Sequence, residues 1–101
     1  MAFAKGGFVY IITNKHHTVL YTGVTSNLVA RIQEHREKAY PKSFSARYNI
    51  NKLVYYAFFE AIEAAIEEEK RIKGGSRENK IRLIESINLE WEDLWEEIKE
   101  W

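Results

Sequence analysis

Glu69 stands where a surface carboxylate is not expected. The pattern of residues 60–73 predicts a helix, and at about 100° per residue Glu69 falls in the middle of the apolar stripe of Ile62, Ala65 and Ile66. A carboxylate that faces a protein core costs several kcal/mol unless a cation or hydrogen-bond donors meet it. A bound metal ion would meet it, and so would an ion pair at the edge of the core, which is the commoner solution.

Arg31 and His35 repeat this anomaly on an earlier helix. Residues 28–38 predict a helix whose apolar face contains Leu28 and Ile32, and Arg31 and His35 share that face as an i, i+4 pair. A guanidinium directed toward the sheet could hold a phosphate through two parallel hydrogen bonds. An imidazole on the same face could deprotonate or orient a water molecule.

Arg31 and His35 also have an ordinary structural explanation. Arg31 could pair with a carboxylate such as Glu34 or Glu69, and His35 could be a half-buried histidine whose ring nitrogens are hydrogen-bonded. For each residue taken singly, this explanation is the commoner one. The case for chemistry therefore depends on whether they meet other polar side chains.

Two tyrosines lie on neighbouring predicted strands. Residues 8–13 and 19–24 are rich in β-branched and aromatic residues, and the short polar segment between them suits a hairpin. Strand tyrosines usually serve packing, but pairing around this loop would bring Tyr10 and Tyr21 close together. Gly23, which has no side chain, would let a ligand or a neighbouring chain approach the backbone.

Together these side chains would form a set suited to phosphodiester hydrolysis. A phenol or an imidazole can activate water, arginine can neutralise charge on the phosphate, and a carboxylate can hold Mg²⁺ near the leaving oxygen. The set consists of Tyr10, Tyr21, Arg31, His35 and Glu69. The sequence contains no P-loop and no dinucleotide fingerprint, and the pair His16-His17 lacks a third metal ligand at a useful spacing.

The elements that must position this set follow from the hydrophobic pattern. We expect strands at residues 8–13, 19–24 and 53–59 and helices at residues 28–38, 60–73, 77–87 and 89–101. Candidate N-caps are supplied by Thr25-Ser26-Asn27 and by Ser76, and Gly74-Gly75 predicts a helix end. This order predicts an α+β fold in which helices cover a small, mainly antiparallel sheet.

Length and composition bound the class of protein. We expect one domain over residues 1–101, with 46% hydrophobic and 14% aromatic residues available for its core. The chain contains no cysteine, which excludes a disulfide framework, a thiolate zinc site and a cysteine nucleophile. This composition fits a reducing cytoplasm, where we expect the protein to act. No apolar run approaches the roughly 20 residues of a membrane span.

The net charge of zero hides an uneven distribution. Residues 1–56 hold eight of the fifteen Lys and Arg residues but only two of the fifteen Asp and Glu residues. The segment from Lys70 to Arg82 is also basic, and acidic residues concentrate after Leu83. A polyanion could therefore meet a positive face, although a solvated surface with uneven charge is the commoner explanation.

The spacing of these residues resembles that of the GIY-YIG nuclease superfamily. The residues that carry the likeness are Val9-Tyr10-Ile11, Tyr21-Thr22-Gly23 and Asn27-Leu28-x-x-Arg31-Ile32-x-x-His35. The later segment from Glu69 to Arg77 looks like the small stand-alone bacterial members, which are often called excinuclease-like domain proteins. Two triplets differ from the Gly-Ile-Tyr and Tyr-Ile-Gly of the founding motif, but both tyrosines and the glycine remain.

The resemblance implies a fold, a reaction and a role for each residue. It implies a three-stranded antiparallel sheet flanked by helices, and an endonuclease that hydrolyses nucleic acid, with DNA the expected substrate and DNA repair the expected setting. One Mg²⁺ or Mn²⁺ would assist. In this likeness Tyr10 and Tyr21 are the motif tyrosines, Arg31 the catalytic arginine, His35 an auxiliary residue and Glu69 the metal ligand. Tyr10 or His35 would activate the water, with Tyr10 favoured.

Two alternatives stay open. The chain could be a non-catalytic module on the same fold that binds nucleic acid or another protein, because a fold does not by itself guarantee activity. The predicted C-terminal helix, which carries Trp91, Trp95 and Trp101, could be a dimer or partner surface, although such a helix more often covers the core. Many superfamily members also have an active-site asparagine after the glutamate, for which Asn79 and Asn88 are available without aligning cleanly.

Overall fold

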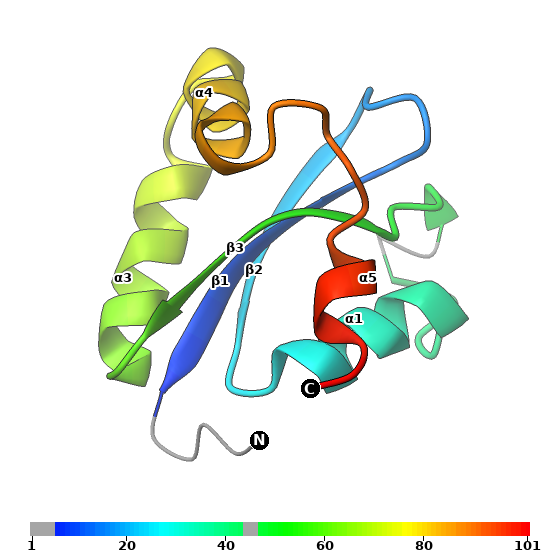
Figure 1. The fold of residues 1–101 in the computed structure, drawn as a ribbon, viewed down its shortest axis with the longest axis horizontal. Coiled ribbons are helices and arrows are strands. Elements are labelled where there is room, and N and C mark those ends of the chain that lie inside the picture. Colours follow the sequence, from blue (N-terminus) through cyan, green and yellow to red (C-terminus); the bar gives the residue numbers. More distant parts are fainter. Residues whose placement is uncertain (1–5, 44–46) are drawn as a thin grey trace.

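Three strands and four helices make up the described part of the chain, which in this computed structural model comprises residues 6–43 and 47–101. They follow in the order β1 (Gly7–Thr13), β2 (Leu20–Thr25), α1 (Leu28–Glu37), β3 (Lys52–Phe59), α3 (Ile62–Lys73), α4 (Arg77–Ile87) and α5 (Trp95–Ile98) (Figure 1). The predicted α+β class is therefore confirmed, and each predicted strand is present within two residues of its expected bounds.

The sheet is antiparallel throughout and has the strand order β2-β1-β3. Because β1 is the middle strand, all seven of its residues are buried. Tyr10 lies between Gly23 on β2 and Tyr56 on β3, and Ile12 lies opposite Tyr21. The register therefore places Tyr10 and Tyr21 on the same face of the sheet as diagonal neighbours.

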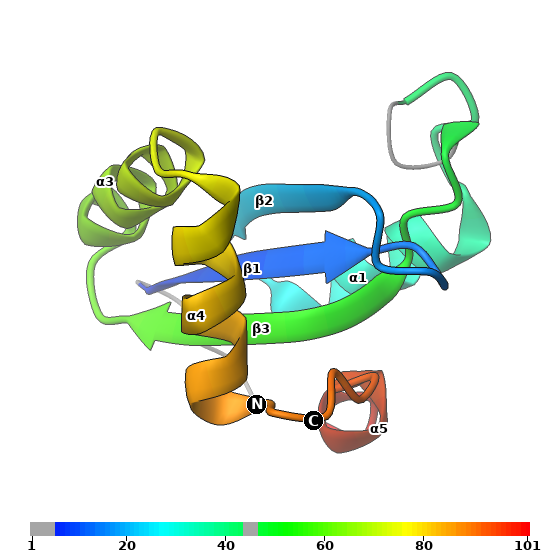
Figure 2. The same cartoon turned by 90° about the horizontal axis from the view of Figure 1, so that it is seen from above.

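The two faces of the sheet support separate hydrophobic clusters. Alternate β1 residues Phe8, Tyr10 and Ile12 pack with α1 and α5, whereas Val9 and Ile11 pack with α3 and α4. Figure 1 shows this division, with α3 and α4 on one side of the sheet and α1 and α5 on the other, and in Figure 2 α4 crosses in front of the strands and α1 lies behind them. A site that includes side chains from both α1 and α3 must therefore lie at an edge of the sheet, where the two faces meet.

Local side-chain bonds fix where the helices begin and end. The carboxamide of Asn27 accepts from the Ala30 amide at 3.1 Å, and the Ser76 hydroxyl accepts from the Asn79 amide at 3.1 Å. These are the side-chain caps that the sequence predicts, and they satisfy amides that have no partner in a first helical turn. Gly74 ends α3 as expected.

The predicted helix at residues 89–101 is wrong over most of its length. Only Trp95–Ile98 is helical, and Trp91 has a φ of 56°, which no right-handed helix allows. Side-chain bonds compete with the helix here, because Asp93 accepts from the amides of Leu53 and Trp95. Leu94 and Ile98 are buried in the core, so the structure gives no support to the partner surface that we considered.

One residue of the predicted α3 stripe is also misplaced. Ala65 is buried as expected, and Ile72 at the end of the helix is buried too, but Ile66 is 37% exposed. α3 packs mainly on β1 and β2, and Ile66 lies outside the hydrophobic cluster that Ile62, Ala65 and Ile72 form there.

Asn88 joins α4 to an irregularity in β3. The pairing of β1 with β3 shifts after Ile11, which leaves Val54 without a partner in the register. The Asn88 carboxamide donates to the Val54 carbonyl at 3.1 Å and to the Glu92 carbonyl at 2.8 Å, and it accepts from the Glu92 amide at 2.9 Å. A single buried side chain thus provides hydrogen-bond partners for backbone groups at the bulge in β3 and at Glu92, after α4.

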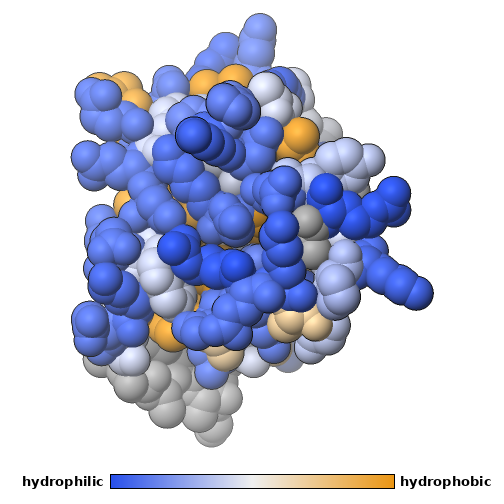
Figure 3. Space-filling model, turned by 90° about the vertical axis from the view of Figure 1, so that its right-hand side faces the viewer, coloured by the Kyte–Doolittle hydropathy of each residue, from blue (hydrophilic) through white to orange (hydrophobic). Residues whose placement is uncertain are grey.

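One face of the molecule is mostly polar. The face shown in Figure 3 is mostly hydrophilic, and its apolar area is divided into small separate patches. Within the described residues, no helix has the length and apolar character needed to cross a bilayer.

Replacement of Asn88 by alanine should lower the free energy of unfolding by about 2 kcal/mol, because buried backbone groups lose their partners. Urea denaturation of the variant and the wild type measures this difference. Asn79→Ala is the matched control, because Asn79 is exposed and its carboxamide makes only a 3.5 Å contact with Arg82. A loss in Asn79→Ala equal to that in Asn88→Ala would contradict the assignment.

Candidate active site

The hydroxyl of Tyr10 is the centre of a buried hydrogen-bond network. Tyr10 comes from β1 and is almost fully buried, and its Oη lies 3.0 Å from His35 Nε2 and 3.3 Å from Arg31 Nε. Arg31 and His35 occupy successive turns of α1 on its sheet-facing side. The structure therefore brings three of the five predicted site residues into direct contact.

Gly23 makes room for this arrangement. A β-carbon at this position would overlap the phenol ring and hydroxyl of Tyr10. Our expectation that Gly23 lets a ligand or another chain approach is therefore corrected, because the space is filled by Tyr10. Glycine is required here by the close approach of a side chain from the neighbouring strand.

Burial fixes the protonation of the network. It raises the pKa of Tyr10 to about 12, although the hydrogen bond from Arg31 opposes this rise. Burial, followed by the positive charge of Arg31, lowers the pKa of His35 to about 4. At neutral pH Tyr10 therefore keeps its proton and His35 is uncharged. The Tyr10 hydroxyl can accept from Arg31 and donate to His35 Nε2 at the same time, and in that arrangement the imidazole proton lies on Nδ1.

Tyr21 completes the aromatic wall of the site. Its ring centroid lies 5.9 Å from that of His35 in an edge-to-face arrangement, and the Tyr10 and His35 centroids are 5.7 Å apart. His35 therefore lies against both tyrosines. Tyr21 is the more accessible of the two, because β2 is an edge strand.

Arg31 is the group of the network that reaches solvent. Its side chain is 30% exposed, and Nη1 donates to Glu34 Oε1 at 3.0 Å while the guanidinium lies over the ring of Tyr40. Glu34 is one of the two partners that the sequence allowed. A guanidinium has five N–H donors, so after these bonds it retains donors that could hold a phosphate oxygen.

Glu69 does not join this network directly. It lies on α3, whose apolar residues belong to the opposite face of the sheet, and its side chain is 13% exposed. Its Oε2 pairs with Lys73 Nζ at 2.8 Å, and that ammonium lies 5.9 Å from the ring centroid of Tyr21. The ion pair, one of the two solutions open from the sequence, is thus present. Sequence reasoning missed Lys73, which its i, i+4 spacing from Glu69 could have indicated.

Glu69 offers a single carboxylate, which limits the kinds of metal ion that it could hold. In the described part of the chain, no three His, Cys, Asp or Glu side chains lie close enough to hold a metal by themselves. Mg²⁺ is commonly bound through one or two carboxylates together with substrate phosphates and waters, which one glutamate can satisfy. Zinc sites need three or four protein ligands. Glu69 therefore suits Mg²⁺ or Mn²⁺ shared with a phosphate.

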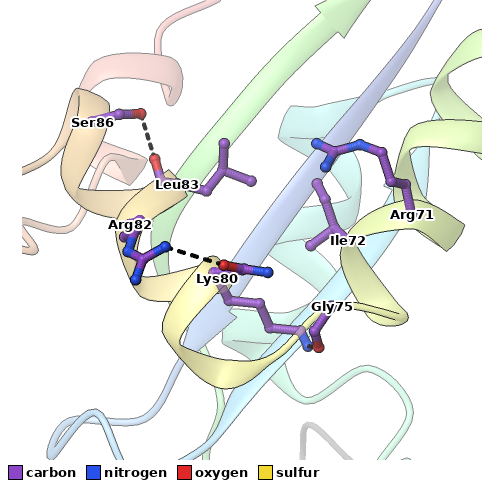
Figure 4. A pocket seen from close by; sticks show the side chains of 8 residues that line it. Arg71, Ile72, Gly75, Lys80, Arg82, Leu83 and Ser86 are labelled. Carbon is purple, nitrogen blue, oxygen red and sulfur yellow. Dashed lines mark hydrogen bonds between the residues drawn. The ribbon is translucent and has the colours of Figure 1, made fainter.

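A basic hollow lies between α3 and α4, and neither Tyr10 nor Tyr21 lines it. Figure 4 shows Arg71, Lys80 and Arg82 around it, with Ile72 and Leu83 lining it as well. Two of these cations already have strong partners. Arg71 pairs with Glu68 at 2.7 Å, and Lys80 donates to the Gly75 carbonyl at 2.7 Å. The bond from Lys80 therefore connects α4 to the residues that end α3.

Neither candidate asparagine lies at the tyrosine cluster. Asn88 is used in the core under α4, as described above, and Asn79 lines the basic hollow. The active-site asparagine found in many members thus has no counterpart among these two residues.

Comparison with known families matches residues 6–82 to the GIY-YIG catalytic domain. The chain belongs to the GIY-YIG family. This is a family of nucleases, so the coarse expectation drawn from the sequence is confirmed.

Similar small GIY-YIG proteins occur in several bacteria. UPF0213 protein CPE1444 of Clostridium perfringens is 38% identical over 91 residues, which cover 90% of this chain and 96% of the relative. A UPF0213 protein of Staphylococcus haemolyticus is 37% identical over 77% of this chain and 93% of its own length. These names assign no activity.

The fold is similar to that of a solved UPF0213 protein. The solution NMR structure of UPF0213 protein BH0048 from Bacillus halodurans matches with a TM-score of 0.55 and 28% identity. The match covers 87% of this chain and 92% of that one. The three-stranded antiparallel sheet flanked by helices is thus the fold of a small GIY-YIG protein.

The low pKa of His35 should make stability depend on pH. In the unfolded chain the histidine binds a proton near pH 6.5, whereas the folded state resists it until about pH 4. Stability is therefore fully present above pH 6.5 and is lost as the pH falls toward 4, by about 3 kcal/mol. Urea denaturation at both pH values should show this loss in the wild type and a smaller one in His35→Gln, which keeps an acceptor for Tyr10. Equal losses in both proteins would show that His35 is not the titrating group.

Proposed function

We propose that this protein is a metal-dependent endonuclease that hydrolyses a phosphodiester bond of nucleic acid, with DNA as the expected substrate. The observation that carries the proposal is the hydrogen-bonded network of Arg31, Tyr10 and His35, in which the charged guanidinium reaches solvent. Family membership supports a nuclease, and the contacts supply groups for the two tasks of hydrolysis, charge neutralisation and proton removal.

Arg31 would hold the scissile phosphate. Its bond to Tyr10 and its pair with Glu34 fix the plane of the guanidinium, so that its remaining donors are preorganised. Negative charge increases on the phosphate oxygens as the attacking oxygen approaches. A fixed cation there stabilises the transition state more than the substrate.

Tyr10 and His35 would remove the proton from the attacking water. Tyr10 takes a proton from water as its own passes to His35 Nε2, and the resulting hydroxide oxygen bonds to phosphorus. The bond from phosphorus to the leaving oxygen then breaks, and that oxygen takes a proton from solvent. The 3.0 Å distance from Tyr10 Oη to His35 Nε2 supports this transfer.

Substrate binding would also make His35 a better base. The charge of Arg31 is one of the causes of the low His35 pKa. A phosphate bound to Arg31 offsets that charge, so the pKa of His35 rises when it is needed.

Glu69 would hold the divalent cation, Mg²⁺ or Mn²⁺, with Tyr21 beside it. When bound, the cation supplies positive charge that stabilises the leaving oxygen. Surface lysines near α1, such as Lys38 and Lys42, would contact the nucleic-acid backbone and contribute salt-dependent affinity. The expected setting is DNA repair in the cytoplasm.

Arg31→Ala should lower the rate of the chemical step by on the order of 100-fold, with much less change in nucleic-acid affinity. The measurement is single-turnover cleavage of labelled oligonucleotides at saturating enzyme, together with equilibrium binding in Ca²⁺. Lys42→Ala is the control, because it should weaken binding modestly and leave the saturated rate nearly unchanged. A wild type that binds but never cuts DNA or RNA would favour the binding-module alternative.

Glu69→Gln should abolish cleavage at every Mg²⁺ and Mn²⁺ concentration while the fold stays intact, because a carboxamide lacks the charge that the cation requires. Cleavage assays across a metal titration, with circular dichroism as the check on folding, measure this. Glu68→Gln is the matched control, since Glu68 pairs with Arg71 and should be dispensable. Full activity in Glu69→Gln would remove Glu69 from the site.

A further inference from the structure

The carboxylate of Glu69 is already covered by a cation of the protein itself. Lys73 Nζ lies 2.8 Å from Glu69 Oε2, and the Lys73 side chain is 51% exposed whereas that of Glu69 is 13% exposed. The lysine is therefore the outer partner of the pair. Its ammonium also lies 5.9 Å from the ring centroid of Tyr21.

The end of α3 keeps Lys73 charged and in place. Lys73 is the last residue of the helix, where the partial negative charge of the helix terminus favours a cation. One carboxylate carries one negative charge, and it cannot bind this ammonium and a divalent ion closely without strong repulsion between them.

We propose that Lys73 is a resident counter-ion of the metal site, which a divalent cation must displace from Glu69. The proposal rests on the proposed function, in which Glu69 is the metal ligand. Lys73 thereby keeps the metal affinity of the free protein low. Its long and half-exposed side chain can move toward solvent or over Tyr21 when the metal ion enters, whereas the carboxylate stays fixed on α3.

The other cations of the same helical turn offer a contrast. Arg71 is paired with Glu68 through two hydrogen bonds, and Lys70 is exposed. Loss of Lys70 removes the same charge from the same turn without uncovering Glu69. It therefore separates a contact at the carboxylate from a general change in charge.

Mn²⁺ binding, followed by electron paramagnetic resonance of the free ion, tests the proposal without any cleavage assay. Lys73→Met keeps the apolar stem and removes the charge, and it should bind Mn²⁺ on the order of tenfold more tightly than the wild type. Lys73→Gln, which can still donate to Glu69, should behave in the same way. Lys70→Met should stay within about twofold of the wild type, since its charge is farther away and screened.

Thermal unfolding gives a second readout that a purely structural lysine would not produce. Without metal, Lys73→Met should unfold at a lower temperature than the wild type, because Glu69 loses its partner. With saturating Mn²⁺, its stabilisation should exceed that of the wild type, because tighter binding stabilises more at a given concentration.

Two results would overturn the proposal in distinguishable ways. If both Lys73 variants bind Mn²⁺ no more tightly than the wild type while Glu69→Gln loses binding, Lys73 only positions the carboxylate, and the proposed function stands. If Glu69→Gln binds Mn²⁺ as the wild type does, the metal is held elsewhere. The metal assignment within the proposed function then fails together with the proposal.

Discussion

A tyrosine hydroxyl buried in the middle strand of a small sheet must find hydrogen-bond partners inside the protein, and much of this structure follows from that requirement. The absence of a side chain at Gly23 makes space for the phenol, and α1 supplies Arg31 as donor and His35 as acceptor. An unpaired hydroxyl at this depth would cost about 1–3 kcal/mol. The same contacts that satisfy Tyr10 therefore fix α1 against the sheet and orient the two groups suited to chemistry.

The polar set is divided by the sheet. The network centred on Tyr10 belongs to the face covered by α1 and α5, whereas Glu69 belongs to α3 on the other face. Lys73, the ion-pair partner of Glu69, lies beside the ring of Tyr21 and so connects the two faces. Lys73 and Tyr21 can meet because β2 is an edge strand, around which side chains from both faces can approach each other. A middle strand would keep Glu69 and the Tyr10 network on separate faces. This division places Arg31, Tyr10 and His35 on one face of the sheet and the helix that carries Glu69 on the other.

Much of this could be predicted from the sequence where a local rule decides the outcome. The strands, the caps at Asn27 and Ser76 and the unusual position of Glu69 all follow from periodicity or from one side chain and its nearest amides. The helix expected at residues 89–101 failed because Asp93 bonds to Leu53, which is distant in sequence. The role of Gly23 was missed for the same reason, since only the pairing of β1 with β2 shows which ring fills its space.

The division between two hydrophobic clusters has a consequence for how the protein responds to heat. Proteins open in parts before they unfold as a whole, and each part has its own free energy of opening. Loosening of either cluster is enough to part Glu69 from the tyrosines, even while the other half of the molecule keeps its native packing. The arrangement that holds Lys73 and Glu69 beside Tyr21 therefore exists only in molecules where both halves are closed together, and its population declines at lower temperatures than the overall secondary structure does.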